Sequence, residues 1–239
     1  DRSRDWQGYR DFERLPTQYY PAGGLCVPDL SSMTGIGLNP FCRERFRRIA
    51  SLAAGDTIIT AREMKLISED VVSVSALAVT GQVLPLLQTG EPDPSDTAAL
   101  LADWDGSMRK GSREAAFYQV FTAELIEQVF TDELGRDLVK REEFRRFLTL
   151  ALPRLMGEDH SAWFDRRDTE LILESGNDIV RASADSALRY CERRMGESSH
   201  SWSWGALHTQ TLAHRLAQNP LLAPAFSGGT FPVGGSSCT

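Results

Sequence analysis

Residues 112–135 read SREAAFYQVFTAELIEQVFTDELG, the most regular stretch of the chain. Apolar side chains recur there at intervals of three and four residues, which is the spacing of one face of an α-helix. They are Phe117, Val120, Phe121, Leu125, Val129 and Phe130. Ser112 is a residue type that favours the start of a helix, and Gly135 is one that favours its end. The stretch therefore predicts a long amphipathic helix within a mostly helical block.

The sequence before this helix predicts four more helices. Residues 43–54 carry apolar side chains at helical spacing, and residues 71–87 form an apolar run with small polar gaps, as a buried helix would. Thr60-Ala-Arg-Glu63 is a capping box, in which the hydroxyl and the carboxylate each accept a backbone N–H. Asp93-Pro94 should open another helix, because proline lacks an N–H that would have no partner in a first turn.

The sequence after it predicts three more. Residues 142–155 continue the helical pattern. Asn177 is the expected N-cap of a helix that runs to Gly196. A last helix is expected over residues 204–217, before an Asn-Pro pair.

This pattern divides the chain into three parts. Residues 1–42 are rich in glycine, proline and turn signals, and Leu25-Cys-Val27 is typical of a short buried strand. Residues 43–200 form a mostly helical lobe, and residues 201–239 return toward the loop-and-strand region. The chain opens with Asp1 and no signal region, and both ends look like cuts, so we expect an internal piece of a longer protein.

Composition excludes some classes of function. The 239 residues include 41% hydrophobic and 25% charged residues, with a net charge of −7, and the isoelectric point is near 5.2. A nucleic-acid surface needs a basic patch, and so does an anionic membrane surface. The run at 71–87 is too interrupted to span a membrane. We therefore expect no nucleic-acid and no membrane partner, and favour small-molecule chemistry or scaffolding.

The four cysteines are Cys26, Cys42, Cys191 and Cys238, far apart and without a CxxC pair. This spacing does not suit a metal site, and a chain of this size does not need disulfide bonds for stability. We expect buried free thiols, while a bridge between Cys26 and Cys42 stays open as an alternative.

Six segments in chain order carry a resemblance to a known family. They are Trp6-Gln-Gly-Tyr9 with Phe12 and Leu15-Pro16; Tyr20-Pro-Ala-Gly-Gly24; Arg45-Phe-Arg-Arg-Ile49; Asp70, Ser73 and Ala76 with Leu84-Pro-Leu-Leu87; Leu101-Ala-Asp-Trp-Asp-Gly106; and Trp202-Ser-Trp-Gly-Ala-Leu-His208 with Pro220 and Phe231-Pro-Val-Gly-Gly235. In this order they resemble the motifs of the penicillin acylase (penicillin amidase) family of N-terminal-nucleophile hydrolases. No single motif is specific to the family, but the six occur in the family's order and together cover nearly the whole chain.

The resemblance implies an α+β protein with a four-layered αββα parent fold, of which this chain is a mostly helical piece of the large subunit with a few short strands near its ends. It implies self-cleavage that exposes an N-terminal serine, which attacks the substrate while its own α-amino group takes the proton. That serine lies outside this chain. The implied partners are the small subunit, the rest of the large subunit and an N-acyl amide substrate, such as a β-lactam side chain or an acyl-homoserine lactone. A periplasmic or secreted location is also implied.

Two positions bear on catalysis through this resemblance. Arg45 matches the arginine that supports the active site, although a solvated helix arginine is the alternative because other arginines crowd the same turn. Leu30 stands where the family places the asparagine of the oxyanion hole, and the nearest asparagine is Asn39. Leucine cannot donate this hydrogen bond. Calcium is often bound between the subunits in the family, but residues 32–43 contain no carboxylate, so we expect no metal ligand and no other cofactor here.

The other polar motifs have structural interpretations. His208 and His214 are six residues apart, which misses the spacing of a helical zinc pair. We expect His208 to pack beside Trp204. Trp104-Asp105-Gly106 is typical of a turn that places the indole in the core while the carboxylate accepts backbone N–H groups.

Two alternatives remain beside the enzyme hypothesis. The first is a non-catalytic binding or scaffold protein that descends from the family and has lost the oxyanion donor at Leu30. The second is an unrelated helical interaction domain, which the ordered motifs disfavour.

Overall fold

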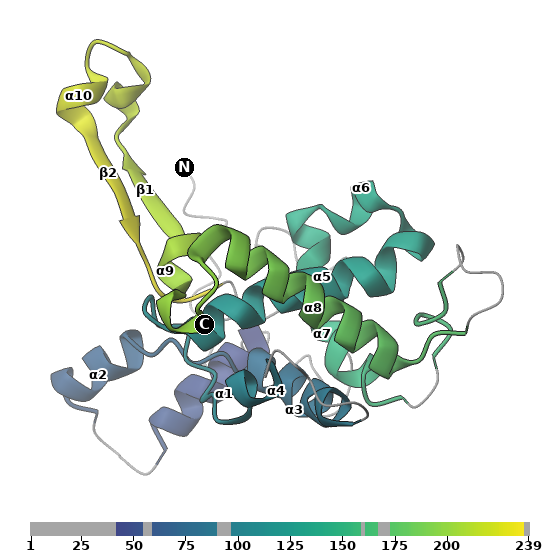
Figure 1. Ribbon diagram of the computed structural model, residues 1–239. Helices are drawn as coiled ribbons and strands as arrows, with labels where there is room; N and C mark the ends of the chain where they lie inside the picture. The colour runs from purple at the N-terminus through teal and green to yellow at the C-terminus, as the bar shows by residue number, and fades with distance from the viewer. Residues whose placement is uncertain (1–41, 55–58, 90–96, 159–160, 167–172, 237–239) are drawn as a thin grey trace, which may run out of the picture.

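The computed structural model describes residues 42–54, 59–89, 97–158, 161–166 and 173–236 (Figure 1). The helices are α1 (Cys42–Leu52), α2 (Ala61–Ser68), α3 (Val74–Gln88), α4 (Thr97–Ala102), α5 (Arg113–Leu134), α6 (Arg136–Val139), α7 (Glu142–Leu155), α8 (Gly176–Met195), α9 (Trp204–Leu207) and α10 (Ala223–Phe226). The strands are β1 (Thr209–Ala213) and β2 (Ser227–Pro232). A mostly helical body with two short antiparallel strands near the C-terminus agrees with the predicted α+β class.

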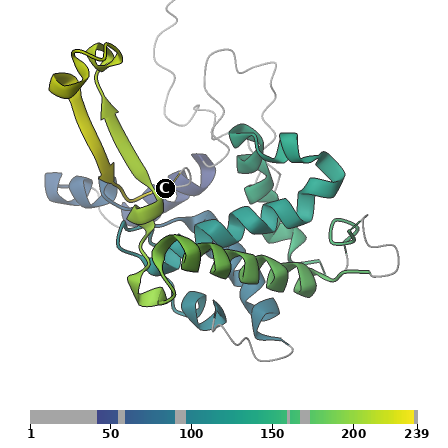
Figure 2. The same ribbon diagram turned by 45° about the horizontal axis from the view of Figure 1, so that its top comes forward.

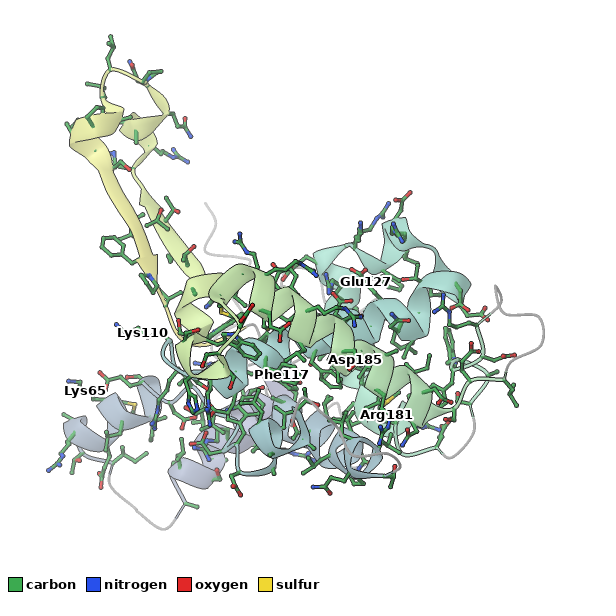
Figure 3. All side chains as sticks on the ribbon, in the orientation of Figure 1. Lys65, Lys110, Phe117, Glu127, Arg181 and Asp185 are labelled. Carbon is green, nitrogen blue, oxygen red and sulfur yellow. The ribbon has the colours of Figure 1, made fainter. Side chains whose placement is uncertain are left out.

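Helix α5 runs through the body, and α8 packs along it (Figures 1 and 2). The hydroxyl of Ser112 accepts the N–H of Ala115 at 3.0 Å, and Gly135 ends the helix with a φ of +80°. Phe117 and Phe121 are fully buried, and their rings stack 6.0 Å apart. In Figure 3, Phe117 lies in the interior of the body. The predicted helix and its apolar stripe are confirmed.

Helix α3 packs against α8 as a second layer, and α8 supplies hydrogen-bond donors to the C-terminal end of α3. Helix α8 begins at Gly176 with a capping box made by Ser175 and Asp178. The prediction that Asn177 caps this helix is therefore wrong, because Ser175 supplies the capping hydroxyl two residues earlier. The Asn177 amide instead donates to the carbonyl of Leu86 at 2.7 Å and to the hydroxyl of Thr89 at 2.5 Å.

The predicted helix over residues 204–217 is also wrong. Its first turn is α9, but the chain then becomes strand β1, followed by a short 3₁₀ helix, Arg215–Gln218. Strand β1 pairs with β2 in antiparallel register, with Thr209 opposite Pro232 and Thr211 opposite Thr230. β-Branched threonines favour extended backbone, and pairing with a segment about twenty residues later outweighs the helical spacing.

The other helical predictions are confirmed where the structure describes them. The capping box at Thr60 begins α2, helix α3 covers most of the apolar run at 71–87 and ends one residue beyond it, and α7 has the expected bounds. Helices α1 and α2 keep apolar side chains exposed, among them Phe46 and Met64. The expected strand at Leu25-Cys-Val27 and the helix start at Asp93-Pro94 lie outside the described residues.

Cys191 is a buried free thiol in α8, as predicted, and burial raises its pKa to about 12. The side chains of the other three cysteines lie outside the described residues. Within the described ranges, no helix is both long enough and apolar enough to cross a membrane.

Candidate functional site

A bidentate ion pair joins α1 to the segment before α3. Arg48 donates from Nε and Nη2 to the two carboxylate oxygens of Asp70, at 3.0 and 2.7 Å. Both side chains are mostly buried, with 30% of Arg48 and 16% of Asp70 exposed. The hydrogen bonds from Arg48 hold the pKa of Asp70 below its usual value, and the nearby charge of Arg45 acts in the same direction. The pair fixes the orientation of α1.

The segment after Asp70 is tied to the Trp104-Asp105-Gly106 turn. Val72 forms a β-bridge with Ser107, and Ser73 donates its N–H to the carbonyl of Gly106 at 2.9 Å. Asp105 accepts the N–H of Ser107 at 2.8 Å, as predicted, and the Trp104 indole is buried.

Gly106 is needed in this turn. Its φ is +76°, and a Cβ there would lie 2.7 Å from Cγ of Leu77.

The segment Trp202–His208 packs against the start of α5 and the residues just before it, which follow this turn in the chain. Trp204 donates its backbone N–H to the carbonyl of Ser112 at 3.0 Å, and Gly205 donates to that of Lys110 at 2.7 Å. Trp202 stacks on Phe117 with ring centroids 6.4 Å apart. The ring of His208 stacks on Trp204 at 4.6 Å, which confirms its predicted packing.

The segment around Pro232-Val-Gly-Gly235 completes this junction. Gly235 donates to the carbonyl of Met108 at 2.8 Å and accepts the indole N–H of Trp204 at 2.8 Å. A Cβ on Gly205 would lie 2.8 Å from Cβ of Pro232, so this close contact requires glycine. Residues 108–112, which follow the Trp104-Asp105-Gly106 turn, thus form one junction with the Trp202–His208 and Pro232–Gly235 segments at the first turn of α5.

A polar groove of about 620 Å³ opens beside this junction. It is lined by charged residues from the turn and from the start of α5: Asp103, Asp105, Arg109, Arg113 and Glu114. Arg113 contacts Glu114 at 2.9 Å and Nδ1 of His200 at 3.0 Å. Burial raises the pKa of Glu114, but hydrogen bonds from Arg113 and Ser112 outweigh it and leave that pKa lowered.

A second groove of about 410 Å³ lies between α5, α7, α8 and α9. Among the described residues, the buried hydroxyl of Thr122 and Nε of Arg146 have no hydrogen-bond partner, and both residues line this groove. Glu124 also lines it, and its pKa is raised by burial and by the charge of Glu127. The groove offers donors and acceptors to a polar group.

Comparison with known proteins agrees with the motifs at this junction. A sequence model of the penicillin amidase family matches residues 1–239. The chain belongs to the penicillin amidase family.

Penicillin amidase relatives with curated descriptions include acyl-homoserine lactone acylases QuiP from three Pseudomonas species. The Pseudomonas aeruginosa protein is 28% identical over 86% of this chain and 27% of its own length. The Pseudomonas putida protein is 28% identical over 95% of this chain and 31% of its own length. The Pseudomonas syringae pv. syringae protein is 25% identical over 100% of this chain and 32% of its own length. The chain thus spans less than a third of each of these relatives, and it comes from a family of amide-hydrolysing enzymes.

The structure describes both arginines of interest in the Arg45-Phe-Arg-Arg-Ile49 motif, Arg45 and Arg48. Arg45 is exposed on α1, so its side chain is free to face a neighbouring segment, and its supporting role in an active site stays a prediction. Arg48, three residues later, makes the ion pair instead, which residue spacing did not reveal because Asp70 is 22 residues away. A signal was present, since Arg48 and Asp70 both belong to the motifs that carry the family resemblance.

Leu30 lies outside the described residues, so the substitution at the oxyanion position stays a sequence interpretation. Within the described ranges, no group of three or more histidine, cysteine, aspartate or glutamate side chains could hold a metal ion.

Proposed function

We propose that the protein to which this chain belongs hydrolyses N-acyl amide bonds, such as those of β-lactam side chains or acyl-homoserine lactones. The observation that supports this most is the family match over all 239 residues. The relatives are described as acyl-homoserine lactone acylases. The Trp202–His208 and Pro232–Gly235 segments contact each other and residues 108–112, which follow the Trp104-Asp105-Gly106 motif, as expected of a segment that retains the family fold.

The proposed chemistry is acyl transfer to an N-terminal serine that is not among residues 1–239. The serine oxygen attacks the amide carbonyl while the serine α-amino group accepts its proton. Collapse of the tetrahedral intermediate breaks the C–N bond, and the amine leaves with the transferred proton. Water then hydrolyses the ester and releases the carboxylic acid. The α-amino group suits this role because it titrates near neutral pH.

Within this chain we propose that Arg45 supports the active site and that Arg48 acts only through structure, as a positioning residue. Arg48 and Asp70 hold α1 in place, so that the exposed Arg45 faces outward from it. Substitution of Arg45 should therefore lower kcat without lowering stability, whereas substitution of Arg48 should lower stability.

A second candidate function is a non-catalytic binding protein, which Leu30 favours. Loss of one oxyanion donor costs on the order of 10²–10³ in rate. Leu30→Asn should therefore raise the hydrolysis rate by about that factor.

The test is to express the complete reading frame that contains residues 1–239. We expect cleavage into two subunits, visible on a denaturing gel, and release of product from a phenylacetyl or fatty-acyl chromogenic amide. A protein that stays uncleaved and inactive, both with Leu30 and with asparagine at that position, would refute the enzyme proposal and leave the binding protein. Leu38→Asn, eight residues along the same segment, is the control and should not raise the rate.

A further inference from the structure

The groove between α5, α7, α8 and α9 has an acidic wall and a basic wall. Glu124 and Glu127 lie one turn apart on α5, and in the view of Figure 3 Glu127 lies between α8 and α6. Arg145 and Arg146 line the groove from α7. A groove of about 410 Å³ is within the size range of small-molecule sites. Its walls are suited to a small ligand that carries both a cationic and an anionic group.

The basic wall has a donor that the described residues do not use. Nη2 of Arg146 donates to Glu142, one turn earlier on α7, at 3.1 Å. Nε of the same guanidinium is buried and has no hydrogen-bond partner among the described residues. A buried charged donor without an acceptor is costly, and a carboxylate is the acceptor that a guanidinium fits best. This wall therefore favours a ligand carboxylate.

The hydroxyl of Thr122 is a second unsatisfied group in the groove. Thr122 is only 6% exposed, and its Oγ1 has no hydrogen-bond partner in the described part of the chain. A threonine inside a helix can donate to the carbonyl one turn earlier. Thr149, which also lines the groove, does so with the carbonyl of Arg145 at 2.8 Å. Thr122 does not, so its hydroxyl is available to a polar ligand.

Glu124 is partly buried in the acidic wall. Burial and the charge of Glu127 raise the pKa of Glu124, because both disfavour its charged form. The charges of Arg145 on α7 and of Arg189 and Arg193 on α8 act in the opposite direction and do not cancel this effect. An ammonium group beside the two carboxylates would offset their repulsion. This wall therefore favours a cationic group.

Aliphatic and aromatic side chains complete the lining of the groove. They are Val120, Ile126, Tyr190, Trp204 and Leu207. Small-molecule sites commonly combine such a lining with a few polar groups that orient the ligand. The lining therefore suits a ligand with an apolar side chain.

We propose that this groove binds a free aliphatic α-amino acid, with its carboxylate against the arginines of α7 and its ammonium group against Glu124 and Glu127 of α5. The proposal does not depend on amide hydrolysis by the protein. An interior segment of polypeptide, residues 1–41 included, would bring a neutral backbone to the groove. An amino acid instead brings an ammonium and a carboxylate on one carbon, which matches the two charged walls.

Equilibrium dialysis of radiolabelled L-leucine against the product of the complete reading frame tests the proposal. We expect a dissociation constant below about 1 mM. The compounds 3-methylbutylamine and 4-methylpentanoate lack the carboxylate and the ammonium group of leucine, respectively. Each should displace leucine at least about tenfold less effectively than unlabelled leucine does. Absence of leucine binding, as when residues 1–41 or another segment fill the groove, would overturn the proposal, and so would equal displacement by either compound.

A matched pair of threonine variants locates the bound leucine. Thr122 and Thr80 are each 6% exposed, and each has a buried hydroxyl without a hydrogen-bond partner among the described residues, but only Thr122 lines the groove. Because valine removes an unsatisfied hydroxyl at either position, neither Thr122→Val nor Thr80→Val should lower the melting temperature. Thr122→Val should weaken leucine binding about threefold to tenfold, and Thr80→Val should leave it unchanged. Equal binding by the two variants would refute the assigned site.

Glu124→Gln tests the acidic wall, since it removes the charge and nearly preserves the shape. Leucine binding should weaken at least about tenfold. The melting temperature should not fall, because burial disfavours the charged carboxylate that is removed. Asp185→Asn, on the exposed side of α8 in Figure 3 and outside the groove, is the control and should leave binding unchanged. Undiminished leucine binding by Glu124→Gln would overturn the proposal.

Discussion

Substitution of Arg48 by alanine tests the ion pair that orients α1. The change removes two charged hydrogen bonds to Asp70, which is only 16% exposed. Charged hydrogen bonds contribute about 1.5–3 kcal/mol when buried, whereas exposed ion pairs contribute about 0–1 kcal/mol. With 30% of Arg48 exposed, we expect a loss of about 1–2 kcal/mol in the free energy of unfolding at pH 7. Urea unfolding followed by circular dichroism measures it.

The pH dependence gives the sign of the effect. Arg48 lowers the pKa of Asp70 in the folded state, so the stabilisation is fully present above the unfolded pKa of about 3.9 and is lost as pH falls through the folded pKa. The difference between wild type and Arg48→Ala should therefore be largest at pH 7 and shrink below about pH 4. Arg48→Lys should recover only part of it, because lysine cannot make the bidentate contact.

Arg45→Ala is the matched control, since Arg45 is an exposed arginine on the same helix. We expect it to change stability by less than about 0.5 kcal/mol. Equal losses for the two alanine variants, or a difference that stays constant from pH 7 to pH 3.5, would refute the ion-pair account.

Three further predictions concern stability and reactivity. Asn177→Ala removes the donors at the end of α3 and should cost about 1–2 kcal/mol in urea unfolding, while Asn219→Ala, in an exposed turn, should cost less; equal costs would contradict this. Gly106→Ala should lower the melting temperature, because it combines a positive φ with a steric clash, whereas Gly81→Ala in open space should raise it slightly; a neutral Gly106→Ala would be the opposing result. Cys191 should resist a thiol reagent at pH 8 until the protein unfolds, since its pKa is about 12 and it is buried; rapid labelling of folded protein would show otherwise.

Local signals predicted much of the fold. The capping box at Thr60 and the glycine at 135 each act within one helical turn, so their residue types are sufficient to place a helix end. The start of α8 was missed by two residues because Ser175 and Asn177 are both good capping residues. What decided between them is tertiary, since the Asn177 amide is used by the end of α3, 91 residues earlier in the chain.

Long-range pairing accounts for the larger errors. Residues 209–213 carry a pattern that a helix or a strand can use, and only their pairing with residues 227–232 decides for strand. The ion pair of Arg48 could not be predicted for the same reason. Three other arginines lie in the same helix, and the sequence does not show which of the four contacts Asp70. The junction at α5 was foreseen only as separate motifs, and the contacts among them come from the folded chain.

That junction also has an optical consequence. Trp104, Trp202 and Trp204 all lie around the first turns of α5, with no more than 9% of each exposed, whereas Trp163 is 38% exposed at the far end of the same helix. Indoles in an apolar environment emit at shorter wavelength than those in water. Among the tryptophans that the structure describes, these three should therefore contribute the short-wavelength emission, and a red shift that precedes the loss of helical signal would show the segments of the junction separating while the helical body is still folded.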